Sequence, residues 1–229
     1  MQRLTFLLRR AKRIVQTEGR GPLARRALAF VMAHFFEHRS YYLYRYDLER
    51  VRSLDRASLL PQIDRLTCKM VSTNRQADEL EAEGFGFRSY SVNARRRLDS
   101  GAMAFCVFVG QELGSIAWVA LDQKAKDSFN EPPVEVDFAG GEAWVGGYWT
   151  SPKHRRMGLH LYNITRTVEY PLERGFHTER YVIEKKNNPS QTAEARFGSE
   201  VYAEGRYLRV LWWRSWKERP LTEGDQCRS

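Results

Sequence analysis

A basic pair and a glycine stand where a strand-like pattern gives way to a helical one. Between 146 and 170 the sequence reads GGYWTSPKHRRMGLHLYNITRTVEY, with Arg155 and Arg156 just before Gly158. The first N–H groups of a helix have no intrahelical acceptor, and the helix dipole adds about half a positive charge there. Arginine offers forked donors to phosphate oxygens, and glycine lets a ligand approach the backbone closely. Residues 155–160 therefore indicate a phosphate-binding cradle, with a solvated basic helix start as the plain alternative.

The sequence gives little support for a P-loop, a metal site or disulfide bonds. The glycine-rich P-loop pattern is absent from the sequence. Cys68, Cys106 and Cys227 form no CxxC pair and, with five scattered histidines, no metal-ligand spacing. We therefore expect no metal site, reduced thiols and a cytoplasmic location, because disulfides form in oxidising compartments.

Charge divides the chain unevenly. Of 229 residues, 42% are hydrophobic, which is enough for a packed core, and the formal net charge is +9. Residues 1–40 contain nine Arg or Lys against two Glu, whereas the remaining 189 residues carry 28 against 26 acidic residues. No apolar run has the length of a membrane span, and arginines interrupt the start where a signal peptide needs an apolar stretch. The basicity thus belongs to the N-terminal end.

The basic N-terminal end carries two helical patterns. Apolar residues recur at helical spacing between 4 and 15, and the segment Gly19 to Pro22 breaks the pattern before a largely apolar helix from Leu23 to His38. Such an extension, residues 1–39, can lie on an anionic membrane surface, pack on the body or a partner subunit, or be a cleaved targeting segment. Nucleic acid is disfavoured, because the body is nearly neutral and no recognition motif is present.

The body alternates strand and helix patterns. The run YYLYRYDL after Ser40 predicts a strand with its tyrosines in the core, residues 51–100 are mostly helical, and two strands then meet at a tight turn of Gly110 and Gln111. The next segments are a strand EAWVGGYWT and a helix from about 158 to 174, which Pro171 kinks or ends. A strand RYVIEKK and a short helix NPSQTAEARFG follow. The sequence then predicts a final strand or strand pair, GRYLRVLWWRSWKE, and a disordered end, PLTEGDQCRS.

Two ordered motifs resemble the acetyl-CoA-binding motifs of the GNAT superfamily of N-acetyltransferases. TSPKHRRMGLH is similar to the Gln/Arg-x-x-Gly-x-Gly/Ala loop between a strand and a long helix, with Arg155, Gly158 and His160 in the three defined places. EKKNNPSQTAEARFGS is similar to the next motif, in which Asn187 and Ser190 open a helix. The resemblance implies an α/β (α+β) fold with a mixed, mostly antiparallel central sheet that is splayed in the middle and has helices on both faces.

The resemblance also implies how acetyl-CoA binds as a co-substrate. Its pantetheine would pair with the strand that ends at Thr150, and its pyrophosphate would lie on the amides of residues 155–160. His160 departs from the motif, because a side chain larger than alanine would crowd the phosphate end. The implied cofactor-binding residues are Trp149, Thr150, Arg155, Arg156, Met157, Gly158, Leu159, His160, Asn187 and Ser190.

The catalytic groups depart further from the family pattern. Many members carry a tyrosine seven positions after the Asn as general acid, but this chain has Glu194, which would need a strongly raised pKa to protonate a thiolate. Tyr202 and Tyr148 are substitutes by residue type. Glu142, thirteen positions before Arg155, suits the general base, and a solvent-facing glutamate at a strand end is its alternative.

These patterns predict a basic amphipathic helical extension at 1–39, a GNAT-like acyltransferase domain at 40–218 and a flexible tail at 219–229. The resemblance implies an acyl-CoA-dependent N-acyltransferase that moves acetyl from acetyl-CoA to an amine of a small-molecule or sugar-linked acceptor by direct attack. Two alternatives stay open: a non-catalytic GNAT-fold protein that binds CoA or a partner, and a peripheral membrane enzyme acting on a lipid-linked precursor.

The aromatic run LWWRSW near the end has two readings. Trp212, Trp213 and Trp216, with Arg209 and Arg214, could stack sugars or bases. Aromatic residues in a terminal strand are more typical of core or interface packing.

Overall fold

The structure is a computed structural model of the chain. It describes residues 36–55, 59–61, 63–91, 93–129 and 131–221. The helices predicted before residue 36 and the tail after residue 221 lie outside these residues. No helix among the described residues is long and apolar enough to cross a membrane.

The chain forms two compact units. Of the described residues, the larger unit contains those within 41–204 with 219–221, and the smaller contains 36–40 with 205–218. All the predicted site residues belong to the larger unit. The division into segments 1–39, 40–218 and 219–229 remains a prediction.

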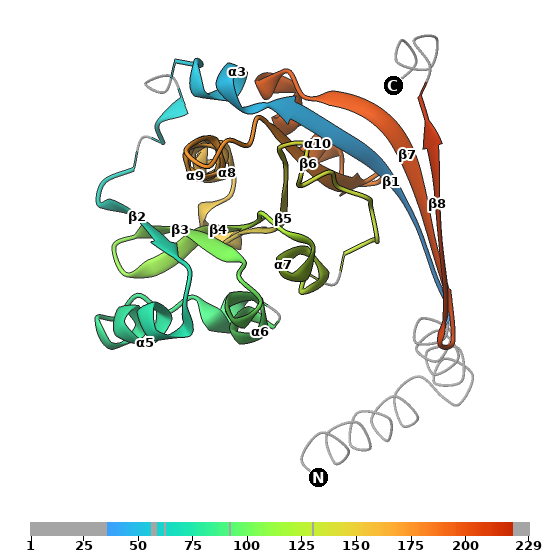
Figure 1. Ribbon diagram of the computed structural model, residues 1–229. Helices are drawn as coiled ribbons and strands as arrows, with labels where there is room; N and C mark the ends of the chain where they lie inside the picture. Colours follow the sequence, from blue (N-terminus) through green and yellow to red (C-terminus); the bar gives the residue numbers. More distant parts are fainter. Residues whose placement is uncertain (1–35, 56–58, 62, 92, 130, 222–229) are drawn as a thin grey trace, which may run out of the picture. The chain divides into compact units, whose positions relative to one another are not determined.

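Strands and helices alternate along much of the chain (Figure 1). The strands are β1 (Phe36–Asp47), β2 (Leu66–Val71), β3 (Met103–Val109), β4 (Glu112–Ala120), β5 (Glu142–Thr150), β6 (Thr178–Glu184), β7 (Glu200–Val210) and β8 (Trp213–Pro220). The α-helices are α3 (Leu48–Arg52), α5 (Asn74–Ala82), α6 (Ala94–Asp99), α7 (Gln123–Asp127), α8 (Leu159–Thr167), α9 (Glu169–Leu172) and α10 (Asn188–Glu194).

The described strands form one mixed sheet in the order β2-β3-β4-β5-β6-β1-β7-β8. Neighbours β2 to β5 are antiparallel, β1 and β6 are antiparallel, and β5 runs parallel to β6. Because β5 and β6 are parallel, the chain must cross over between them, and α8 and α9 make that connection. The sheet is therefore mixed and mostly antiparallel, as predicted.

Helices cover both faces of the sheet in the larger unit (Figure 1). On one face, α8 and α9 pack on a core that includes Val145 and Tyr181. On the other face, α5, α6 and α7 cover β2 to β4. That second face buries Trp118 and Trp144 completely, and the Phe87 ring lies against Trp118. The α/β (α+β) prediction with helices on both faces is confirmed.

Two sequence predictions are wrong in detail. The segment 51–100 contains strand β2, whose alternating exposure includes exposed Cys68 and Met70. Since β2 is an edge strand with one weakly apolar face, its sequence lacks a strong strand pattern. The helix predicted to reach His38 is also wrong at its end, because β1 begins at Phe36. The tyrosines of β1 are mostly in the core, as predicted, and Tyr44 and Tyr46 are 5% and 3% exposed.

Pro171 divides the crossover helix as predicted. Helix α8 ends at Thr167 and α9 begins at Glu169. A proline has no N–H to donate, and its ring clashes with the carbonyl four residues earlier, here that of Thr167. Helix α8 therefore ends at the residue that Pro171 would otherwise contact.

Candidate functional site

The two central strands, β5 and β6, are paired over three residue pairs and then separate. Strands β5 and β6 are paired only from Glu142 to Trp144 on one strand and from Thr178 to Arg180 on the other. Beyond this point β5 continues to Thr150 and β6 to Glu184 without pairing to each other. The sheet is thus splayed in the middle, and among the described strands none pairs with the β6 side of β5 beyond Trp144.

A glycine pair lies just after the parting point. The register between β4 and β5 shifts between Ile116 and Trp118, which are paired with Trp149 and Gly146, so the extra residue of β5 lies at Gly147 and Tyr148. Gly147 has a φ of 58°, which favours glycine, and a Cβ there would also collide with the guanidinium of Arg97. Glycine inside a strand is typical of a bulge or a close approach to the backbone. Both apply here.

The turn from β5 into α8 matches the predicted cradle. A short 3₁₀ segment, Pro152–His154, leads to Arg155 and Arg156, whose side chains are exposed. Gly158 caps α8 with a φ of 81° and no side-chain cap hydrogen bond. Its nearest neighbour would be 3.9 Å from a Cβ, so backbone conformation rather than crowding requires the glycine.

Seven consecutive backbone amides of this turn have no hydrogen-bond acceptor among the described residues. The amide of His154 donates to the carbonyl of Ser151 at 2.9 Å, and the amide of Tyr162 donates to that of Gly158 at 2.9 Å. Between them, the amides from Arg155 to Leu161 donate to no described group. Such an array of unpaired N–H groups at a helix start is suited to an anion.

The neighbouring predicted residues differ in what they offer. Met157 is 46% exposed, whereas Leu159 is buried against Val107 and can contribute only backbone. Trp149 and Thr150 end β5, where the Trp149 ring packs 4.9 Å from that of Tyr90. The cofactor role of these residues remains a proposal.

Asn187 and Ser190 cap the start of helix α10. Asn187 is the N-cap of α10, and its Oδ1 accepts a hydrogen bond from the backbone amide of Ser190 at 3.4 Å. The Asn-x-x-Ser spacing therefore closes the start of a helix. This task does not test the predicted contact with a cofactor.

His160 lies between β5 and α10. Its ring is 4.9 Å from that of Tyr148 in an edge-to-face arrangement, and its Nε2 is 3.4 Å from Oε1 of Glu194. The latter contact lacks hydrogen-bond geometry. The histidine thus extends from the start of α8 toward α10.

A second carboxylate is buried on the same face as Glu194. Glu194 accepts a hydrogen bond from the Tyr181 hydroxyl at 2.9 Å, and Glu179 accepts one from the Tyr46 hydroxyl. Glu179 is fully buried, and burial raises the pKa of its carboxyl group to about 8. Burial likewise raises the pKa of Tyr148 well above its usual value. Glu179 and Tyr148 therefore favour their neutral forms.

Glu142 and Tyr202 meet on the opposite face. Arg180 Nη2 lies 2.6 Å from Oε1 of Glu142, and its Nη1 donates to the Tyr202 hydroxyl at 3.4 Å. Successive residues of β6 alternate between faces, so Arg180 points away from the side of Glu179 and Tyr181. The structure thus brings together Glu142 and Tyr202 but separates both from Glu194.

Sequence reasoning missed Glu131. Its Oε1 accepts a hydrogen bond from the Gly147 amide at 2.8 Å, and its Oε2 accepts one from Trp144 Nε1 at 2.8 Å. Burial raises the pKa of this carboxyl group. The double glycine in EAWVGGYWT was the available signal of a close approach, but it does not say which residue approaches.

Arg97 was also missed. It is 6% exposed, donates through Nη2 to the Phe129 carbonyl at 3.0 Å and lies 5.1 Å from the centre of the Trp118 ring. Burial lowers the pKa of its guanidinium. A carboxylate and a guanidinium therefore flank the glycine pair at the bulge, which provides both a proton acceptor and a positive charge.

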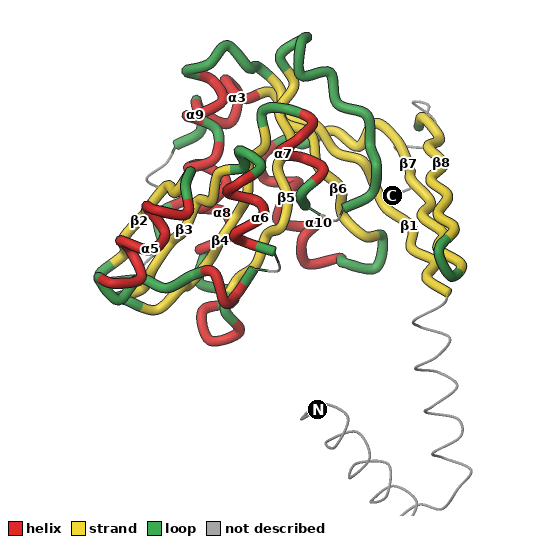
Figure 2. The backbone as a smooth tube through the Cα atoms, turned by 60° about the horizontal axis from the view of Figure 1, so that its bottom comes forward, coloured by secondary structure: helices red, strands yellow, loops and turns green. Residues whose placement is uncertain are grey.

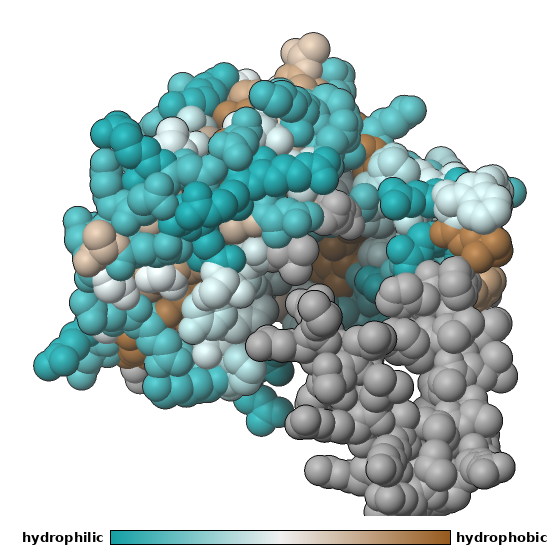
Figure 3. Space-filling view, turned by 90° about the horizontal axis from the view of Figure 1, so that it is seen from below, coloured by the Kyte–Doolittle hydropathy of each residue, from teal (hydrophilic) through white to brown (hydrophobic). Residues whose placement is uncertain are grey.

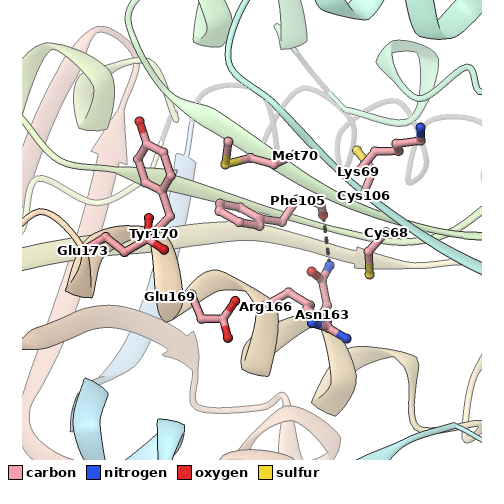
Figure 4. A pocket seen from close by; sticks show the side chains of 10 residues that line it. All are labelled: Cys68, Lys69, Met70, Phe105, Cys106, Asn163, Arg166, Glu169, Tyr170 and Glu173. Carbon is pink, nitrogen blue, oxygen red and sulfur yellow. Dashed lines mark hydrogen bonds between the residues drawn. The ribbon is translucent and has the colours of Figure 1, made fainter.

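A separate pocket of about 280 Å³ shares no residue with this turn (Figure 4). Its walls come from β2, β3, α8 and the α9 region. Asn163 lies in it and donates to the Phe105 carbonyl at 3.1 Å. Among the described residues, no group of three His, Cys, Asp or Glu side chains could hold a metal ion.

Comparison with solved structures places this arrangement in a known fold. A GCN5-related glucosamine N-acetyltransferase region of a fungal multi-domain GH3 beta-N-acetylglucosaminidase superposes with a TM-score of 0.52 at 9% identity, covering 80% of this chain and 22% of that one. The fold of the chain is that of the GNAT N-acetyltransferases, with the splayed sheet and strand–turn–helix junction described above.

Two further solved structures have lower TM-scores. A GCN5-related N-acetyltransferase from Kribbella flavida gives 0.46 at 14% identity, covering 80% of this chain and 63% of that one. A tandem GNAT protein from the clavulanic acid biosynthesis pathway gives 0.47 at 17% identity, covering 89% and 60%. The chain spans less than two thirds of the length of each of these three proteins. No family model and no curated protein matches the sequence.

Proposed function

We propose that the protein is an acyl-CoA-dependent N-acyltransferase that transfers acetyl from acetyl-CoA to an amine. The observation that carries the proposal is the row of amides from Arg155 to Leu161 that have no acceptor among the described residues, in the turn that follows the unpaired part of β5. The amides are suited to a diphosphate, and the unpaired edge of β5 is suited to an amide-bearing chain such as pantetheine. One cofactor with both features is coenzyme A.

The side chains around the row support anion binding. Arg155 and Arg156 are exposed at the turn, where they can add charge-assisted hydrogen bonds to the phosphate oxygens. Met157 and Gly158 leave the backbone accessible, and Leu159 is held in the core. Asn187 and Ser190 on α10, with Trp149 and Thr150 on β5, complete the proposed cofactor residues.

The proposed reaction is direct attack of a neutral amine on the thioester carbonyl carbon. A C–N bond forms, the C–S bond breaks, the ammonium proton goes to a carboxylate, and the CoA thiolate takes up a proton. We assign the proton-accepting role to Glu131 in preference to Glu142. Glu131 contacts the open segment of β5 at Gly147, and its raised pKa suits a base, whereas Glu142 is held by Arg180.

The group that protonates the thiolate has three proposed candidates. Tyr202 shares the face of Glu131 and Glu142, while Glu194 and Tyr148 lie on the other face. Of these, Tyr202 is the only one beside Arg180, whose charge stabilises an anion. Positioning and one base can also suffice, because orientation alone lowers a barrier by several kcal/mol.

A non-catalytic CoA-binding protein is the second candidate. The Gly147 amide, which belongs to the part of β5 that is not paired with β6, already donates to Glu131. His160 also extends across toward Glu194. Both observations favour a protein that binds the cofactor without turning it over.

Calorimetric titration with acetyl-CoA tests the cradle. We expect binding that weakens about threefold to tenfold in Arg155→Gln with Arg156→Gln, because two charge-assisted contacts are lost. Arg75→Gln, an exposed arginine on α5, is the matched control. Absence of heat at millimolar acetyl-CoA overturns the proposal.

Thiol release with a panel of amines separates the enzyme from the binder. The panel includes glucosamine, because the fungal region is named for that acceptor. Release of thiol with any amine supports acyl transfer. Intact binding with no release across the panel favours the non-catalytic protein.

A further inference from the structure

The tip of the β7–β8 hairpin exposes bulky apolar side chains. Trp212 is 86% exposed, Trp213 54% and Leu211 45%. Figure 2 shows β7 and β8 as neighbours joined by a short loop, and pale and brown side chains gather at that end in Figure 3. The core interpretation of the LWWRSW run is wrong for Trp212 and Trp213. A turn that ends two strands exposes its side chains unless another element covers it.

The tip is built at a conformational cost. Leu211 has a φ of 58°, in the left-handed region that bulky residues rarely adopt. Two-residue hairpin turns usually contain Asn, Asp or Gly because these residues tolerate positive φ. Leu-Trp is therefore a poor choice for hairpin stability. Strain of this kind is typical of positions kept for a contact outside the folded chain.

Basic side chains outnumber acidic ones in the described part of the smaller unit, and Arg214 lies next to the tip in sequence. Within residues 36–40 and 205–218, five Arg or Lys residues stand against two Glu. Arg206, Arg214 and Lys217 are exposed, whereas Arg209 pairs with Glu37 at 3.0 Å. The described part of the smaller unit thus has an apolar end and a positive surface.

We propose that residues 210–213 insert into the interfacial region of an anionic lipid bilayer. Tryptophan favours this region, because its ring is apolar while its N–H can reach water and headgroups. Arginines beside an inserted tip attract anionic headgroups, and their long stems keep the charge at the surface. The hairpin backbone is paired between its own strands, so inserting the tip leaves few polar groups unsatisfied.

A second copy of the chain fits this end less well. Strand β8 is an edge strand, but Arg214 and Lys217 lie along it, and charges on an edge oppose pairing with another edge. The proposal does not depend on acyl transfer, since it rests on a surface in the smaller unit.

The test uses the full chain and sedimentation with vesicles of phosphatidylcholine alone or with phosphatidylglycerol. We expect binding to the anionic vesicles only, weakening with salt. Of the two loop residues, Leu211 has a positive φ and Trp212 does not, as in a type II′ turn, so Leu211→Gly with Trp212→Asn introduces a preferred turn sequence and the hairpin stays folded. It should lower the partition coefficient about tenfold or more, because most of the inserted apolar area is lost. Arg214→Gln should lower it about threefold to fivefold.

Two controls make the result decisive. Met70→Ser removes an apolar side chain of 46% exposure from the larger unit and should not change sedimentation. Circular dichroism should show unchanged content in the turn variant, with a melting temperature at or above that of the unchanged chain. The proposal is overturned if the turn variant binds vesicles as well as the original chain does, because other residues then carry the binding. Absence of sedimentation with anionic vesicles overturns it too, as does a dimer that the turn variant converts to a monomer.

Discussion

Arg180 of β6 holds Glu142 of β5 with 2.6 Å between Nη2 and Oε1, and the two residues belong to the last and the first of the three residue pairs that join the strands. The pair is diagonal across the parallel register, because Arg180 stands opposite Trp144 and Glu142 precedes Trp144 by two residues. Both side chains are mostly buried, with 20% and 14% exposure. The ion pair therefore spans the whole segment in which the two strands are paired.

Breaking this pair should destabilise the fold. We expect Arg180→Met to lower the free energy of unfolding by about 1–3 kcal/mol, because it leaves a mostly buried carboxylate without its partner. Adding Glu142→Gln should recover part of the loss. Urea denaturation of the single and double variants measures both effects. If the single and the double variant lose the same free energy of unfolding, Arg180 contributes little to stabilising the Glu142 carboxylate.

Two glycines with the same backbone conformation separate binding from stability. Gly158 has φ 81° and Gly175 has φ 82°. A Cβ added at either glycine would lie 3.9 Å or more from the surrounding side chains and backbone. Replacing either by alanine should cost about 1–2 kcal/mol of folding free energy, since L-residues resist this conformation. Only Gly158→Ala should also weaken acetyl-CoA binding, measured by calorimetry. If Gly175→Ala weakens it equally, the effect is one of general stability.

Glu179 should make stability depend on pH. Its pKa is raised from 4.5 to about 8 in the folded protein by burial, so the folded state holds a proton that the unfolded state has released between these values. The contribution of Glu179 to stability is then fully present below pH 4.5 and is lost as pH rises toward 8, at up to about 1.4 kcal/mol per pH unit. Glu179→Gln should remove this slope.

Urea denaturation at pH 5, 7 and 9 checks the slope. As pH rises, the free energy of unfolding of Glu179→Gln should increase relative to that of the unchanged chain. At pH 9 the variant should be the more stable of the two. A difference that is constant across the three values would mean that Glu179 is ionised in the folded protein.

The two candidate bases predict different pH profiles. If Glu131 takes the ammonium proton, Glu131→Gln should lower kcat/KM about 100-fold and remove the acidic limb of the profile, which lies above the usual glutamate range because burial raises the pKa of Glu131. Glu142→Gln should leave that limb in place. The opposite result would return the role to Glu142. The assay is thiol release with an amine found active in the panel.

Local patterns were sufficient for the elements around the turn. The β3–β4 hairpin, β5, α8 with its end ahead of Pro171, and β6 were predicted from apolar runs and turn residues. The two motifs that resemble the GNAT pattern also predicted the mixed, splayed sheet. The edge strand β2 was not predicted, because a half-exposed strand has no strong apolar pattern in its sequence.

Long-range contacts decided the rest. Gly146 and Gly147 are visible in the sequence as an oddity within a strand, but only the folded chain brings Glu131 to the Gly147 amide and Arg97 beside it. Sequence reasoning likewise proposed Glu142 and Glu194 from their spacing, and Tyr202 from its residue type, as catalytic groups. The alternation of β6 puts Glu194 on the opposite face from the other two.

The sequence by itself determined the turn between β5 and α8, because a helix start, a positive-φ glycine and a basic pair are properties of neighbouring residues. It also determined the character of the sheet through motifs whose order and spacing are local. Tertiary structure decided which carboxylates meet which amides and which aromatic residues stay exposed. Burial and pairing between distant segments depend on the register of strands and the packing of helices, and these are set by the whole chain at once.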